Sequence, residues 1–116
     1  MINQPQQDVL NLLRPLIERE QNRISKHNRR ATRLGLPGTL TLHQWLYTLH
    51  HYQWKCAYCA NPYQSLDHVI PIGQGGGTTA TNCVPACHEC NHKRGQFFSR
   101  EREIIQALAE LERPIC

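Results

Sequence analysis

The feature that most constrains this chain is a double pair of cysteines. Two Cys-x-x-Cys pairs flank the segment 60–86, and their members are Cys56, Cys59, Cys87 and Cys90. Zinc prefers four sulfur or nitrogen ligands in a tetrahedron, and two such turns complete a closed site with no position left for water or substrate. The pairs therefore predict a structural zinc ion that fixes both ends of the segment and contributes directly to folding stability.

Other uses of the six cysteines fit the sequence less well. The chain has 116 residues, which suits one small domain whose modest core benefits from a metal staple. Its first residues, MINQPQQDVL, lack the cationic and apolar regions of a secretory signal, so we expect a cytoplasmic protein rather than a disulfide scaffold. No apolar run approaches the roughly 20 residues of a membrane span, so we expect no membrane association. His88 is an alternative zinc ligand inside the second pair, although Cys90 has the better spacing, and Cys83 is expected to be a small buried residue.

Positive charge is concentrated in one part of the chain. The net charge is +4, and no acidic residue occurs between Gln21 and Leu66. A polyanionic partner such as nucleic acid explains this asymmetry, and so does an ordinary solvated helix face. The candidate phosphate-binding residues of this stretch are Arg23, Lys26, Arg29, Arg30 and Arg33.

Residues 1–51 are expected to form a helical, basic N-terminal region. Apolar residues recur at helical spacing in the range 9–17. Pro15 either kinks this helix or lies in the first turn of a helix that starts near Arg14. Thr41 is a suitable N-cap for a second helix, whose apolar face consists of Leu42, Trp45, Leu46 and Leu49.

Residues 52–98 are expected to hold the functional core. SLDHVI has the pattern of a short strand, GQGGGTTATN that of a loop, and NCVPA that of an extended return. A helix is expected from near Cys87 to Gly95. Residues 99–116 are expected to add a C-terminal helix with an apolar stripe, which makes the whole chain one compact α+β domain.

The order of these motifs resembles a known family. CAYC, LDHVIP, GGGTTATNCVPAC and CHECNHKRG together resemble the HNH endonucleases of the ββα-metal, or His-Me finger, group, from about Trp54 to Phe98. The resemblance is specific because it requires two cysteine pairs, an Asp-His, a glycine-rich loop and an asparagine in that order. It implies a β-hairpin that carries the Asp-His and a following helix that completes a divalent-metal site.

The resemblance also implies roles for individual residues, in an H-N-N variant of the motif. His68 matches the general base that activates water, and Asp67 the carboxylate ligand of Mg²⁺ or Mn²⁺. Asn82 matches the residue that braces the loop and orients the histidine. Asn91 matches the last metal ligand, although its neighbour His92 is an alternative, and only one of the two can face the metal. Neighbouring strand residues point to opposite faces, so Asp67 and His68 reach one phosphate only where a bend or the metal geometry re-aims them.

The implied activity is one-metal hydrolysis of nucleic-acid phosphodiesters, with 5′-phosphate and 3′-hydroxyl products. The expected substrate is duplex or branched DNA, with RNA as a further option, in a bacterial or phage setting. Lys93 and Arg94 are expected to add phosphate contacts. A monomer would nick and a homodimer would cut both strands. The alternative is a non-catalytic zinc-knuckle module that binds DNA, which explains the cysteines and the charge but not the four polar residues Asp67, His68, Asn82 and Asn91.

Overall fold

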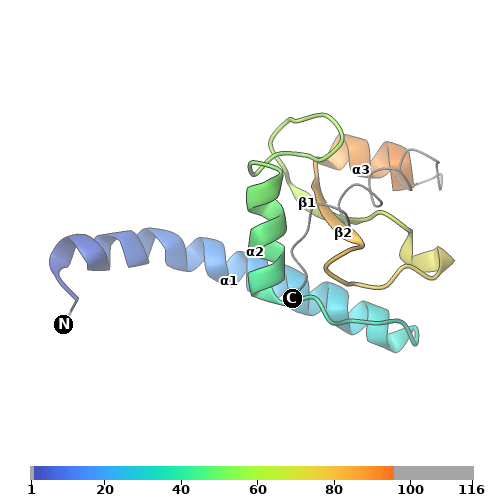
Figure 1. Ribbon diagram of the computed structural model, residues 1–116, viewed down its shortest axis with the longest axis horizontal. Helices are drawn as coiled ribbons and strands as arrows, with labels where there is room; N and C mark the ends of the chain where they lie inside the picture. The colour runs from blue at the N-terminus through green and yellow to red at the C-terminus, as the bar shows by residue number, and fades with distance from the viewer. Residues whose placement is uncertain (1, 96–116) are drawn as a thin grey trace.

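A computed structural model describes residues 2–95 of the chain, with side chains as far as Lys93 (Figure 1). The helix expected at residues 99–116 lies outside the described residues. None of the described helices is long and apolar enough to cross a membrane.

Two helices precede a β-hairpin, and a third helix follows it. The helices are α1 (Gln4–Arg33), α2 (Leu42–His51) and α3 (His88–Gly95), and the strands are β1 (Ser65–His68) and β2 (Cys83–Ala86). The strands pair antiparallel, with Asp67 opposite Val84 and His68 opposite Cys83. A short 3-10 turn, η1 (Ile72–Gln74), lies in the connecting loop. The predicted α+β class and the hairpin followed by a helix are confirmed.

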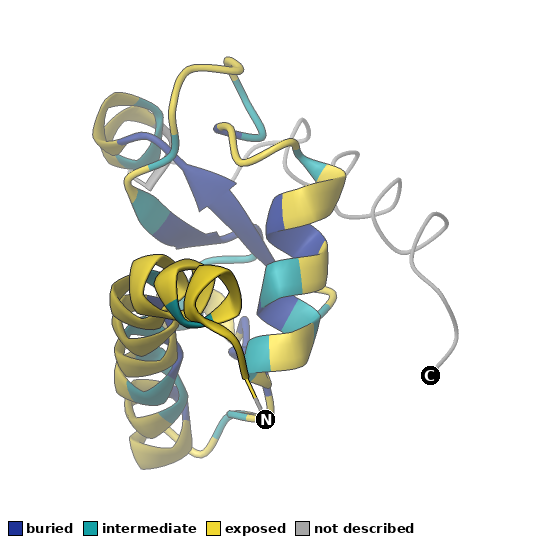
Figure 2. Ribbon diagram, turned by 90° about the vertical axis from the view of Figure 1, so that its left-hand side faces the viewer, coloured by how far each residue is buried: buried dark blue, intermediate teal, exposed yellow. Residues whose placement is uncertain are grey.

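Helix α1 is longer than the sequence indicated. Asn3 caps it: the Asn3 side chain accepts a hydrogen bond from the Gln6 amide, and the Gln6 side chain accepts one from the Asn3 amide. The helix then continues through Pro15 and has 30 residues. The alternative of a helix starting near Arg14 is therefore wrong, because this capping box satisfies the first turn much earlier. The N-terminal half of α1 extends away from the body, and its apolar side chains are exposed (Figures 1 and 2). Burial begins at Glu20.

The core lies where α1 and α2 pack on the hairpin. Thr41 caps α2 as predicted, and it accepts a bond from the backbone of Gln44. Trp45 and Leu49 are fully buried against the hairpin. Figure 2 shows β2 as buried and β1 as buried except at its first residue, which is intermediate. The whole core cluster is Ile24, Leu40, Trp45, Leu49, Leu66 and Cys83, which confirms the prediction that Cys83 is buried.

A buried carboxylate joins α1 to α2. The Glu20 side chain has no exposed area, and it accepts from Trp45 Nε1 at 2.9 Å. Arg19 and Arg23 donate to its two oxygens at 2.9 and 3.0 Å. Burial alone would raise the pKa of Glu20, but the hydrogen bonds and the charge of Arg23 outweigh burial and lower it. Glu20 is therefore an ionised residue inside the core, which its position in a polar helical stretch gave no reason to expect.

Candidate active site and metal centre

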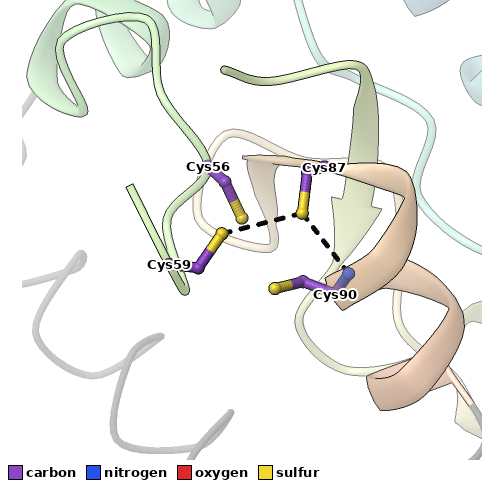
Figure 3. Close-up of side chains that lie close together, drawn as sticks. All are labelled: Cys56, Cys59, Cys87 and Cys90. Carbon is purple, nitrogen blue, oxygen red and sulfur yellow. Dashed lines mark hydrogen bonds between the residues drawn. The ribbon is translucent and has the colours of Figure 1, made fainter. Parts of the chain in front are cut away.

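The four predicted cysteines come together at one end of the hairpin. Their sulfur atoms all lie within 4.8 Å of one another (Figure 3). Cys59 Sγ and Cys87 Sγ are 3.7 Å apart. A zinc–sulfur bond of about 2.3 Å in a tetrahedron requires sulfur separations of about 3.8 Å, so this cluster fits zinc. His88, the alternative ligand, is exposed and is not part of the cluster.

The backbone around the cysteines is held as a pair of zinc knuckles, the two Cys-x-x-Cys turns. The Tyr58 amide donates to Cys56 Sγ and the Cys90 amide to Cys87 Sγ, both at 3.4 Å. The first knuckle is also fixed to the hairpin, because Ala57 N donates to the carbonyl of Pro85 at 2.9 Å. The cysteine cluster and β2 therefore form one rigid unit.

Asp67 lies on the knuckle side of β1. It is 5% exposed, and its Oδ2 accepts a hydrogen bond from the phenol of Tyr58. Tyr58 belongs to the first knuckle, between Cys56 and Cys59, and it packs against the buried residues Cys56, Ala86 and Cys87. The carboxylate thus has a partner that comes from the zinc site.

His68 is the last residue of β1, and the chain bends directly after it. The ring is 8% exposed, and its Nε2 lies 2.9 Å from Thr78 Oγ1. Thr78 Oγ1 in turn lies 3.0 Å from the carbonyl oxygen of His27 on α1. A carbonyl only accepts and a threonine hydroxyl has one proton, so Thr78 donates to His27 and accepts from His68. Neutral His68 is therefore protonated at Nε2, and Nδ1 carries the lone pair.

The surroundings of His68 keep its ring neutral. Burial, with smaller contributions from the neighbouring His27 and the charge of Arg30, lowers the pKa of His68 to about 4. The His27 ring meets the His68 ring edge-on at a centroid distance of 5.4 Å. His68 therefore contacts α1 from the face of β1 opposite to Asp67.

Asn82 clamps the loop between the strands. Its Oδ1 accepts from Ile70 N at 2.8 Å, and its Nδ2 donates to the carbonyls of Ile70 and Gly77 at 3.1 and 2.8 Å. The loop is so close that a Cβ on Gly76 would lie 1.8 Å from the Ile70 carbonyl oxygen. Glycine is therefore required at position 76, and Asn82 holds the turn that directly follows His68.

Asn91 and His92 point in different directions on α3. Asn91 Nδ2 donates to Ser65 Oγ at 3.1 Å, whereas His92 is exposed. Ser65 and Asp67 share one face of β1 because strand side chains alternate. The structure thus brings Asn91 to the face that carries Asp67, and it places His68 on the other face.

The candidate phosphate-binding residues of α1 fall into two groups. Lys26, Arg29, Arg30 and Arg33 are exposed. Arg23 is engaged within the protein, since it donates to Glu20 and, at 3.0 Å, to the Gln64 carbonyl. On α3, Lys93 pairs with Glu89 at 2.9 Å, and the Arg94 side chain lies outside the described part.

The sequence did not single out Tyr58, Thr78 or His27. Tyr58 stands inside the CAYC turn, and that position was the one available signal. Thr78 and His27 are 51 residues apart, so no local sequence pattern predicts their contact.

A β-hairpin followed by a helix, with a cluster of four cysteines beside an Asp-His pair, defines a ββα domain whose cysteines are positioned for zinc binding. The sequence model of the HNH endonuclease family matches residues 56–97, which include both knuckles and the whole hairpin. This segment therefore belongs to the HNH endonuclease family.

Two curated proteins match the same part of the chain. The type IV methyl-directed restriction enzyme EcoKMcrA of Escherichia coli is 40% identical over 48 residues, which are 41% of this chain and 17% of that enzyme. The CRISPR-associated endonuclease Cas9 of Corynebacterium diphtheriae is 41% identical over 46 residues, which are 35% of this chain and 4% of that protein. The chain thus spans only a small part of the length of the relatives that it matches.

Proposed function

We propose that this protein is a metal-dependent endonuclease that hydrolyses phosphodiester bonds in DNA. The observation that carries the proposal is the paired placement of Asp67 and His68 at the end of β1, both buried and each with its own partner. Buried polar groups are costly unless they are hydrogen-bonded, and such held groups concentrate at functional sites. Their position within the segment that matches the HNH family gives the arrangement its chemical meaning.

Asp67 and Asn91 are the proposed ligands of a catalytic Mg²⁺ or Mn²⁺. Their donors fit such an ion, because a carboxylate and an amide oxygen are hard ligands. Asn91 of α3 contacts Ser65, which shares a face of β1 with Asp67. A bound cation would supply positive charge at the scissile phosphate and the leaving oxygen. Burial of Asp67 keeps water away from the carboxylate and limits its motion.

His68 is the proposed general base. Thr78 accepts from Nε2–H, so Nδ1 is the nitrogen that takes the proton from the attacking water. Asn82 fixes the turn directly after His68 and thereby limits movement of the ring. A bend follows His68 directly, and the proposed reaction requires that this bend let the His68 ring and Asp67 approach one phosphate from two sides.

The proposed substrate is DNA, bound through the exposed cations of α1. Both named relatives are bacterial nucleases, one a restriction enzyme and one a CRISPR-associated endonuclease, which favours DNA and a bacterial cytoplasmic setting. Lys26, Arg29, Arg30 and Arg33 lie on the solvent side of α1, and Arg30 is close enough to act on the His68 ring. Phosphate contacts from these residues would hold the backbone beside the candidate site.

A non-catalytic zinc-knuckle module accounts for less of the structure. Such a module needs the cysteine cluster and the basic helix, but it has no use for a buried Asp67 or for a histidine held by Thr78.

Nicking of supercoiled plasmid by the zinc-loaded protein with Mg²⁺ or Mn²⁺ tests the proposal. We expect wild type and His43→Ala, a control on the exposed face of α2, to nick equally. His68→Ala should lower the nicking rate by roughly a hundredfold or more, because a general base typically contributes at least that factor. Equal nicking by His68→Ala and wild type would reject the assignment. A parallel assay with a labelled RNA transcribed from the same plasmid distinguishes a deoxyribonuclease from a ribonuclease.

A further inference from the structure

The hydrogen bond between Tyr58 and Asp67 joins two sites that have different purposes. Tyr58 lies between the first two cysteines of the zinc cluster, and Asp67 is a proposed ligand of the catalytic cation. We infer that Tyr58 is a positioning residue through which the structural zinc knuckle orients the Asp67 carboxylate for cation binding. This inference rests on the proposed function, because it takes Asp67 as a cation ligand.

The backbone of Tyr58 is fixed by the knuckle. Its amide donates to Cys56 Sγ at 3.4 Å, and the next residue back, Ala57, is bonded to Pro85 in β2. The ring packs against Cys56, Ala86 and Cys87, which are all buried. A side chain that is held at its backbone and along its ring has little rotational freedom left, so its hydroxyl stands at a defined place.

The hydroxyl end of Tyr58 restrains Asp67. The phenol donates to Oδ2. A carboxylate can accept such a bond and ligate a cation at the same time, because it has two oxygens and about four acceptor sites. Hydrogen-bond partners of this kind fix the orientation of a ligand before the metal arrives. Their removal typically weakens metal affinity by roughly 10–100-fold.

The zinc cluster and the candidate cation site are therefore coupled through one phenol. Bound zinc would fix the CAYC turn, and this turn positions the Tyr58 ring. The hydroxyl of that ring then donates a hydrogen bond to the Asp67 carboxylate. The closed zinc site cannot take part in hydrolysis itself, since it has no open coordination position. Its influence on the reaction reaches Asp67 through Tyr58.

Binding of Mn²⁺ to the zinc-loaded full chain tests this coupling without any cleavage assay. Electron paramagnetic resonance of free Mn²⁺ gives the dissociation constant. We expect Tyr58→Phe, which removes only the hydroxyl, to weaken Mn²⁺ binding about tenfold. Tyr47→Phe is the matched control, because Tyr47 is an exposed tyrosine on α2. It should bind Mn²⁺ as wild type does.

Zinc content and circular dichroism of each variant complete the experiment. The inference requires that Tyr58→Phe keep its zinc and its fold while it loses Mn²⁺ affinity. Unchanged Mn²⁺ affinity overturns it, and so does loss of zinc, since the phenol would then act on the knuckle itself. Asp67→Asn tests the cation site separately from the role of Tyr58. If this variant binds Mn²⁺ as tightly as wild type, the proposed cation site is wrong.

Discussion

At the scale of single residues, the hydroxyl of Thr78 determines which nitrogen of His68 would act as the base in the proposed reaction. Thr78 is fully buried and joins the ring to the His27 carbonyl. Replacement by valine keeps the shape but leaves a buried Nε2–H without its acceptor. We expect Thr78→Val to lower the plasmid-nicking rate by roughly tenfold or more, as part of the general-base contribution is lost, with little change in KM.

Two further variants distinguish a lost hydroxyl from a general loosening of the loop. Thr78→Ser restores the hydroxyl and should restore most of the rate, whereas Thr81→Val, at an exposed position of the same loop, should behave as wild type. Nitrogen NMR of the His68 ring should show the Nε2–H form in wild type and a shifted tautomer balance in Thr78→Val. A tautomer balance that valine leaves unchanged would contradict the role of Thr78.

The residues that the sequence could single out are those whose pattern is local. The cysteines, the Asp-His and the loop asparagine stand at spacings that can be recognised without a fold. Tyr58 and Thr78 were not predicted as site residues, because their hydrogen-bond partners become their neighbours only after folding. Thr78 meets a carbonyl 51 residues away, and nothing in a one-dimensional pattern encodes the direction of a side chain.

At the scale of elements, the length of α1 was the least predictable feature. Pro15 indicated either a kink or the first turn of a helix that starts near Arg14, yet the capping box at Asn3 starts the helix well before it, and the helix continues through the proline. The short strands of the hairpin were predicted because turn and loop residues bracket them closely. The packing of α1 on α2 was not predicted, because it depends on the buried Glu20.

Glu20 should make the stability of the α1–α2 contact depend on pH. Its folded pKa lies below the ordinary value, so its stabilising contribution is complete above the unfolded pKa, near 4.5, and is lost as pH falls through the folded pKa. We expect Glu20→Gln to lower the free energy of unfolding by roughly 2 kcal/mol near neutral pH. This difference from wild type should shrink as the pH falls below about 4.

Urea unfolding of both proteins across this pH range measures the difference directly. Taking the difference removes acid effects that both proteins share, such as protonation of the cysteines. Glu18→Gln, at an exposed position two residues earlier on α1, should differ little from wild type at every pH. A Glu20→Gln difference that stays constant down to acid pH would show that the carboxylate charge is not what stabilises this contact.

At the scale of the whole molecule, the zinc cluster connects the hairpin to α3 and substitutes for core that so short a chain lacks. We expect one zinc per chain by elemental analysis, and a large loss of thermal stability after chelation. Cys56→Ala should lose the zinc. Cys83→Ala, in the core but outside the cluster, should keep it and lose only packing energy. Equal zinc content in both variants would contradict the four-cysteine site.

DNA binding by the whole molecule should depend steeply on salt, because exposed cations displace ions condensed on the duplex. Four phosphate contacts predict that log K falls against log salt with a slope of about −3.6. Arg30→Ala should reduce this slope by about one unit on every duplex sequence, as expected of a phosphate contact that reads no bases.

Arg23→Ala provides the contrast within the same helix. Its guanidinium is engaged by Glu20 and the Gln64 carbonyl, so its removal should lower stability and leave the salt slope unchanged. Fluorescence anisotropy of a labelled duplex at several salt concentrations measures both slopes. A binding constant that is flat with salt would reject α1 as the DNA-binding surface. An equal fall in slope for Arg23→Ala would show instead that the internal ion pair of Glu20 opens when DNA binds.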